Sequence, residues 1–295
     1  MHQDIVNLLP DAPKLDRREF FVTSIFAAGT FGMAALPINS QTQIKTDEAG
    51  LITGEVKIPV SDGEIPAYRA IPDKKGKKFP VVLVVHEIFG VNEWIQDLCR
   101  RFAKLGYMAI APALYARQGE IKDLKDPRTI NMQIFSKIPD TQSMSDLDAA
   151  TAWAGTNRGD PKKLSITGFC WGGRIVWMYA EHNPAVKAGA AWYGKLAATE
   201  RSPLNPQQPT MPIDHVKDLK GAVIGFYGGL DTSIPVDTVQ RMQDELKKAG
   251  SKSELIVYPN AKHGFFADYR DSYNKQAAED AWPKLLAWFK NYGAV

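Results

Sequence analysis

The sequence predicts an α/β fold in which helices cover both faces of a mostly parallel central sheet. Short apolar segments with the length of strands alternate along the chain with longer segments of helical periodicity. Residues 81–85 form the unbroken apolar run VVLVV, which is typical of a strand buried on both faces. Strands separated by helices form βαβ units, and these units place their strands in parallel.

A hairpin is the first predicted element. Residues 55–60 and 65–71 alternate apolar and polar side chains on either side of Asp62-Gly63, a dipeptide that favours a tight turn. Further strands are predicted at residues 80–86, 107–111, 163–167, 186–192, 222–227 and 254–258. Helices are predicted at residues 94–105, 143–153, 174–181, 236–249 and 275–292. Ser143 or Ser145 is the predicted cap of the second helix, and the proline-rich segment 203–212 is interpreted as a surface excursion.

The composition is that of a globular protein. The chain has 295 residues, of which 44% are hydrophobic and 23% charged, so it can bury a sizeable core. We expect one domain from residue 50 to residue 295. The net charge of +3 is spread along the chain without a basic run, so nucleic acid is not an expected partner.

Residues 1–45 are predicted to be a signal-like or tail segment. Arg17 and Arg18 precede the apolar stretch 22–36, and this arrangement resembles the twin-arginine signal of bacterial export. The stretch is too short for a stable membrane span. We therefore expect a periplasmic or otherwise exported protein. The alternative is a docked helix or tail on a cytoplasmic protein.

The segment around Cys170 predicts a catalytic nucleophile. Gly168 and Gly172 lie two residues before and after Cys170, between a predicted strand and a predicted helix, which is the spacing of a nucleophile elbow. The free N–H groups and positive end of the helix would stabilise a thiolate and an oxyanion. The alternative is a buried cysteine in a glycine-rich turn. Cys99 lies within a helical pattern and is interpreted as a core residue, and a disulfide between the two cysteines is not expected.

Two later loops supply the expected partners of this thiol. Asp231 and His263 each follow a predicted strand, so both lie at the carboxyl edge of the sheet together with Cys170. The order nucleophile, acid, histidine is that of the α/β-hydrolase fold. His263 would move the protons, and Asp231 would orient the imidazole. The other histidines, His2, His86, His182 and His215, are less suitably placed.

The segment after VVLVV predicts the oxyanion hole. In α/β-hydrolases the loop after this strand supplies a second backbone donor. Here the donors would be the N–H groups of Ile88 and Trp171. Glu87 is an unusual residue beside a nucleophile, and its alternative role is a solvated or salt-bridged loop residue.

Six motifs together resemble the dienelactone hydrolase (carboxymethylenebutenolidase) family. They are HEIFG, LYARQ, GFCWGG, WYG, GGLD and HGFF, in this order within residues 54–292. The resemblance implies a single-domain α/β-hydrolase with the triad Cys170, Asp231 and His263. It also implies that Glu87 contacts the nucleophile and helps to ionise it when an anionic substrate binds. Arg117, in LYARQ, resembles the family residue that binds the substrate carboxylate.

The sequence departs from the family at one substrate-binding position. The family has a second arginine four residues after the catalytic histidine, where this chain has Ala267, and the nearest basic residue is Arg270. The departure weakens the expectation of strict dienelactone specificity. Tyr193, in WYG, follows a predicted strand and is predicted to line the pocket and contact substrate, with core packing as the alternative.

These residues predict a carboxylic ester hydrolase of the carboxymethylenebutenolidase kind. It would open a lactone or small ester that bears a carboxylate, through an acyl-thioester on Cys170. No cofactor or metal is expected, because the sequence carries no evident ligand cluster. The expected partner is the small-molecule substrate, and the protein is expected to be a monomer or small homo-oligomer. One alternative is a broad-specificity carboxylesterase, and another is a non-catalytic binding or redox-sensing module.

Overall fold

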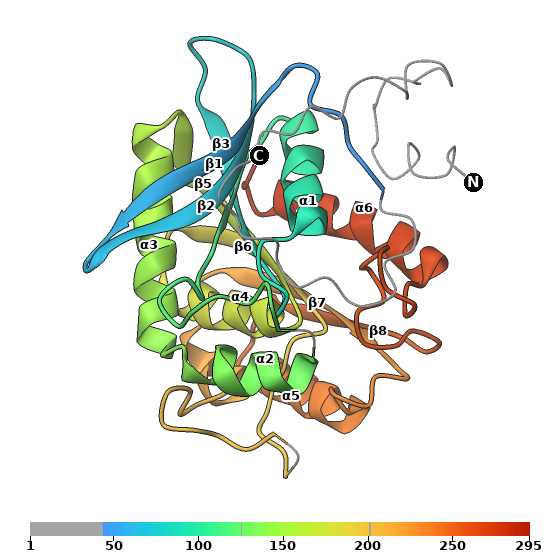
Figure 1. Cartoon of the computed structure of the whole chain (residues 1–295). Coiled ribbons are helices and arrows are strands. Elements are labelled where there is room, and N and C mark those ends of the chain that lie inside the picture. Colours follow the sequence, from blue (N-terminus) through green and yellow to red (C-terminus); the bar gives the residue numbers. More distant parts are fainter. Residues whose placement is uncertain (1–43, 125, 201) are drawn as a thin grey trace.

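The computed structural model describes residues 44–124, 126–200 and 202–295 (Figure 1). The predicted export signal, with Arg17 and Arg18, lies outside the described residues. No helix within those residues is both long and apolar enough to cross a membrane.

Eight strands form one sheet in the described part of the chain. The strands are β1 (Leu51–Val60), β2 (Gly63–Pro72), β3 (Phe79–Val85), β4 (Met108–Pro112), β5 (Gly159–Phe169), β6 (Val186–Trp192), β7 (Ala222–Gly228) and β8 (Glu254–Tyr258). Their order is β1-β2-β4-β3-β5-β6-β7-β8. β2 pairs antiparallel with β1 and with β4, and every other pair is parallel. The predicted hairpin and mostly parallel sheet are confirmed, and the topology is that of an α/β-hydrolase.

Helices cover both faces of this sheet, as predicted (Figure 1). On one face lie α1 (Glu93–Lys104) and α6 (Lys275–Asn291), joined by contacts of the Phe102 ring with Trp282 and Phe289 at centroid distances of 5.0 and 6.2 Å. On the other face lie α3 (Asp140–Thr156) and α4 (Trp171–His182), joined by a 3.1 Å hydrogen bond between the hydroxyls of Thr151 and Tyr179. The α5 helix (Val236–Lys248) and α4 both contact the 3₁₀ helix η3 (Pro212–Asp218).

The predicted start of α3 is wrong. The helix begins at Asp140, and Pro139 occupies the capping position. Ser143 and Ser145 lie inside the helix, where their hydroxyls donate to the carbonyls of Pro139 and Gln142. The serines satisfy backbone carbonyls within the helix, so they do not cap its N-terminal N–H groups.

The structure also contains short helices that were not predicted. These are α2 (Pro127–Gln133), η2 (Phe135–Lys137) and η3. Asp126 caps α2 by accepting a 2.7 Å hydrogen bond from the N–H of Thr129, and Pro127 occupies the first helical position. An acidic residue followed by proline is a helix-start signal that could have indicated α2.

A buried ion-pair cluster ties α1 to the C-terminal half of the chain. Asp97 is 1% exposed and accepts from Arg101 at 2.6 Å and from Arg100 at 3.3 Å. Arg101 also pairs with Asp268, 3.4 Å away. The N–H of Thr46 donates to Asp97 as well, so the described residues 44–49 dock against α1.

We expect Asp97→Asn to lower the free energy of unfolding by about 3 kcal/mol, because removing one partner of a buried ion pair leaves the others uncompensated. Urea denaturation at neutral pH would measure the change. Glu64→Gln is the control. Glu64 pairs with Lys57 at the surface, and its loss is expected to change stability by less than about 0.5 kcal/mol. Similar values for both variants would contradict a stabilising role of the buried cluster.

Candidate active site

The turn from β5 into α4 has the geometry of a nucleophile elbow. Cys170 lies between the strand and the helix with a φ of +54°, in the left-handed region that non-glycine residues rarely adopt. A Cβ at Gly168 would overlap the carbonyl of Gly172, and a Cβ at Gly172 would lie 2.5 Å from the carbonyl oxygen of Val85. Both positions therefore require glycine, and the elbow packs directly on the end of β3.

Asp231, after β7, and His263, after β8, meet Cys170 at the carboxyl edge of the sheet. His263 Nδ1 lies 2.7 Å from Asp231 Oδ2, and the imidazole also hydrogen-bonds the side chain of Cys170. The other carboxylate oxygen of Asp231 accepts from the N–H groups of Ser233 and Ile234 at 2.7 and 3.0 Å. These backbone bonds hold the carboxylate in place, so the three predicted residues form one hydrogen-bonded chain.

The charges in this chain favour a protonated imidazole. Burial disfavours the charged ring, but the charge of Cys170 and the hydrogen bonds with Asp231 and Cys170 outweigh it and raise the pKa of His263 to about 10. The arrangement therefore favours a charged imidazolium next to Cys170.

Glu87, two residues after the end of β3, is 1% exposed. It accepts a 2.5 Å hydrogen bond from the hydroxyl of Tyr269 and pairs with Arg270 Nη1 at 2.9 Å. Across the described residues, no hydrogen bond joins Glu87 to Cys170, and the expected contact of Glu87 with the nucleophile stays a prediction.

Arg270 reaches Glu87 by crossing the loop that carries His263. Tight turns follow one another here, with Ala267 N–H donating to Gly264 and Arg270 N–H donating to Ala267. Gly264 has a φ of +76°, and a Cβ there would lie 2.5 Å from Arg270 Nη1. Ala267 itself is fully buried. The guanidinium next to Glu87 therefore comes from a position three residues later than in the family pattern.

His86 orients the predicted oxyanion loop, a role that the sequence analysis did not assign. Its Nε2 accepts from the N–H of Leu114 at 3.3 Å, so Nδ1 carries the proton and donates to the carbonyl of Glu87 at 2.8 Å. Burial lowers the pKa of His86 to about 4, which keeps the ring neutral. In a trans peptide the N–H points opposite to the carbonyl, so this bond turns the N–H of Ile88 away from His86.

The second predicted donor, the N–H of Trp171, belongs to the first residue of α4 and has no carbonyl four residues back within the helix. Within the described ranges, neither Ile88 nor Trp171 donates its N–H in a loop or turn hydrogen bond. Both groups are free to meet an oxyanion, and that role stays a prediction.

The comparisons with known proteins agree with this geometry. A profile of the Dienelactone hydrolase family matches residues 65–293. The chain belongs to the dienelactone hydrolase family. It is 54% identical over 282 residues to a Methylorubrum extorquens protein named "Putative carboxymethylenebutenolidase", covering 95% of this chain and 94% of that protein. An Escherichia coli K12 protein of the same name is 48% identical over 263 residues, covering 89% and 95% of the two chains.

A solved structure is similar as well. The crystal structure of a "Putative Dienelactone Hydrolase" from Klebsiella pneumoniae superposes with a TM-score of 0.79 at 48% identity, covering 82% of this chain and 99% of that one. The chain is thus a hydrolase of the dienelactone hydrolase family, and the family predicted from the six motifs is confirmed.

Tyr193 is fully buried in this dienelactone hydrolase family member. Its ring lies edge-on to His263 at a centroid distance of 5.1 Å. Burial, reinforced by the charge of Glu87, raises the pKa of Tyr193 well above its usual value. Its hydroxyl has no hydrogen-bond partner among the described residues, and its contact with a substrate stays a prediction.

Arg117 is paired with two aspartates. Its Nη2 contacts both oxygens of Asp146 on α3, at 2.6 and 2.7 Å, and its Nη1 lies 3.3 Å from Asp62 in the β1–β2 turn. In the ranges that the structure covers, no hydrogen bond or ion pair joins Arg117 to the triad. Its predicted contact with a substrate carboxylate would require that carboxylate to compete with two aspartates.

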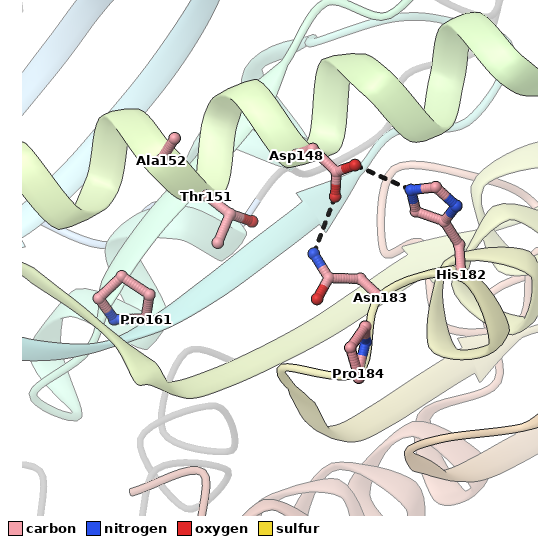
Figure 2. Close-up of a pocket in the computed structure, with 7 residues that line it drawn as sticks. All are labelled: Asp148, Thr151, Ala152, Pro161, His182, Asn183 and Pro184. Carbon is pink, nitrogen blue, oxygen red and sulfur yellow. Dashed lines mark hydrogen bonds and ion pairs between the residues drawn. The ribbon is translucent and has the colours of Figure 1, made fainter.

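A surface hollow of about 370 Å³ lies near the far end of α4 (Figure 2). Asp148 on α3 points toward His182 and Asn183, with contacts of 2.8 Å to each. The 12 residues of α4 separate this hollow from Cys170 by about 18 Å, so it takes no part in the thiol chemistry.

One group of side chains in the described ranges could hold a metal ion. It consists of Glu181 on α4 with His215 and Asp218 on η3, whose donor atoms lie within 4.8 Å of one another. This group also lies at the far end of α4 and does not contact the triad. The candidate active site itself brings together the thiol of Cys170, the imidazole of His263 and the carboxylate of Asp231.

Proposed function

We propose that this hydrolase opens a lactone or small carboxylic ester that bears a carboxylate, using Cys170 as nucleophile. The observation that carries the proposal is the hydrogen-bonded chain from Cys170 through His263 to Asp231, with the pKa of His263 raised to about 10. A thiolate stabilised by an adjacent imidazolium is nucleophilic at neutral pH.

The first half of the reaction forms a thioester. The Cys170 thiolate attacks the carbonyl carbon, and the developing oxyanion accepts hydrogen bonds from the N–H groups of Ile88 and Trp171. When the C–O bond of the ester breaks, His263 transfers the Nε2 proton to the departing alkoxide. Nδ1 keeps its proton and its bond to Asp231.

The second half releases the product. Neutral His263 takes a proton from water, and the resulting hydroxide attacks the thioester carbon. The C–S bond breaks, Cys170 departs as a thiolate, and the thiolate–imidazolium pair is restored. A lactone is thereby converted to its hydroxy acid without an added cofactor.

The substrate range has two readings. Strict preference for an anionic lactone is supported by the family. A broader carboxylesterase activity is favoured by Ala267 at the second family arginine position and by the aspartate pairing of Arg117. A comparison of kcat/KM for dienelactone with kcat/KM for neutral activated esters tests these readings.

The same assay tests the enzyme reading as a whole. Hydrolysis of lactones or esters should be accompanied by an acyl adduct on Cys170, visible by intact-protein mass spectrometry after rapid acid quenching. If His263→Ala and Cys170→Ser leave hydrolysis unchanged, the proposed mechanism is wrong. Reversible oxidation of Cys170 without any hydrolysis would favour a redox-sensing module.

We expect Arg117→Ala to separate anionic from neutral substrates. Loss of one charge-assisted contact is worth about 1.5–3 kcal/mol, so kcat/KM for an anionic lactone should fall about 10- to 100-fold while a neutral ester is unaffected. Steady-state kinetics on both substrates provide the measurement. Equal losses on the two would mean that Arg117 acts through its pairing with Asp146 and not on the substrate carboxylate.

We propose export through the twin-arginine-like segment around Arg17 and Arg18, with a cytoplasmic protein as the alternative. Fractionation of the native cells, followed by mass measurement of the protein, would decide between the two and would show whether the segment is cleaved.

A further inference from the structure

The segment that follows β6 is pressed against the nucleophile elbow. The N–H of Cys170 donates to the carbonyl of Trp192 at 2.9 Å. Two residues later, a Cβ at Gly194 would overlap the backbone of Gly173. This contact carries the chain past the start of α4 and delivers Lys195 to the neighbourhood of the thiol.

Lys195 is a half-buried cation without a carboxylate partner. Its ammonium group donates to the hydroxyl of Ser202, and no ion pair is formed with any acidic side chain in the ranges that the structure describes. Burial lowers the pKa of Lys195, and the negative charge of Cys170 opposes that effect. The ammonium and the nucleophile therefore lie within electrostatic range of each other.

Three arginines, by contrast, are already paired with carboxylates. Arg270 is paired with Glu87 at 2.9 Å, Arg117 with Asp146 at 2.6 Å, and Arg174 with Asp140 at 2.6 Å. An incoming anion would have to displace a paired carboxylate from each of these arginines. For Lys195 to bind an anion, only its hydrogen bond to the neutral hydroxyl of Ser202 has to break.

We propose that Lys195 is a specificity-determining residue that binds the carboxylate of an anionic lactone or ester substrate beside Cys170. The proposal rests on the proposed hydrolase function and deepens it, because it adds a cation that selects for negative charge. A half-buried ammonium gains more from an anion than an exposed one, since less water screens the pair.

The test is Lys195→Met, which keeps the length of the apolar stem and removes the charge. The substrates are a lactone that carries a free carboxylate and the same lactone as its carboxamide. We expect kcat/KM for the acid to fall about 10- to 100-fold, mainly through KM, and that for the carboxamide to change less than about twofold. Lys195→Arg should retain part of the preference for the acid.

Two variants serve as matched controls. Lys187→Met removes an exposed lysine from the same segment of chain, on β6, and should change neither substrate. Ser202→Ala removes the hydroxyl partner of Lys195 but keeps its charge, so the preference for the acid should remain. Circular dichroism and thermal midpoints confirm that each variant is folded.

Two results would overturn the proposal. Equal losses on acid and carboxamide would mean that Lys195 acts on the thiolate and not on the substrate, and no loss on either would mean that it does neither. If the wild type hydrolyses neither compound, the proposed function fails. In that case, calorimetric binding of the same pair to wild type and Lys195→Met still decides whether Lys195 binds the carboxylate.

Discussion

Replacing Cys170 with alanine is expected to lower kcat/KM for lactone and ester hydrolysis by at least about 10³-fold, the scale on which loss of a triad nucleophile is felt. The variant keeps the elbow but has no atom that can form the thioester. Residual turnover would come from the oxyanion donors and substrate positioning alone. Steady-state kinetics and the disappearance of the acyl adduct by mass spectrometry measure the effect.

Cys99→Ala is the matched control for this variant. Cys99 is fully buried in α1, and burial raises the pKa of its thiol far above the usual value. It should therefore be inert toward iodoacetamide in the folded protein and dispensable for turnover. If activity survived in Cys170→Ala but was lost in Cys99→Ala, the assignment of Cys170 as the nucleophile would be wrong.

Asp231→Asn is expected to lower kcat by about 10³- to 10⁴-fold, because the amide neither fixes the useful tautomer of His263 nor stabilises its charge. Asp231 is among the groups that raise the pKa of His263 to about 10, so its neutralisation lowers that pKa. As the pH rises, the imidazolium that protonates the leaving group then loses its proton at a lower pH than in the wild type. The alkaline limb of the kcat/KM profile should move toward neutrality.

The same pKa has a consequence for stability. His263 has a folded-state pKa of about 10 against an ordinary value of 6.5. The stabilisation that this represents is present in full below pH 6.5 and is lost as the pH rises through 10. The difference in thermal midpoint between wild type and Asp231→Asn should therefore be larger at pH 6 than above about pH 10.

Asp237→Asn is the control for both measurements. This carboxylate is exposed in the first turn of α5 and does not contact the triad. The kcat/KM profile against pH and the thermal midpoints of Asp237→Asn should be the same as those of the wild type. An unshifted alkaline limb in Asp231→Asn would contradict the assignment of that limb to His263.

Much of the fold could be predicted because its signals are local. The run VVLVV and the strand–turn–helix around Cys170 are each encoded within a few residues, and the structure has both. The order of Cys170, Asp231 and His263 predicted that they share one sheet edge, and the parallel register brings them together. The start of α3 was mispredicted from Ser143 and Ser145 because a serine is a common side-chain cap. The helix in fact begins at Asp140, after Pro139, without a side-chain cap.

The surroundings of the triad could not be predicted, because they depend on pairings between distant parts of the chain. Glu87 meets Tyr269 and Arg270 across more than 180 residues. The pairing of Arg117 with Asp62 and Asp146 joins a hairpin turn, a loop and a helix. No spacing of residues along the sequence predicts such contacts. The dual hydrogen bonding of His86 is likewise visible only once β3 and β4 lie side by side.

The crossing of Arg270 over Gly264 has a consequence for protein engineering. A guanidinium restored at position 267, as in the family pattern, would be introduced at a fully buried position, while Glu87 already has a cation partner in Arg270. A second buried cation without a carboxylate partner would be uncompensated. Exchanging Arg270 and Ala267 as a pair avoids that second cation. Gly264 would be released from its close approach to the guanidinium by that exchange, but its φ of +76° would still favour glycine.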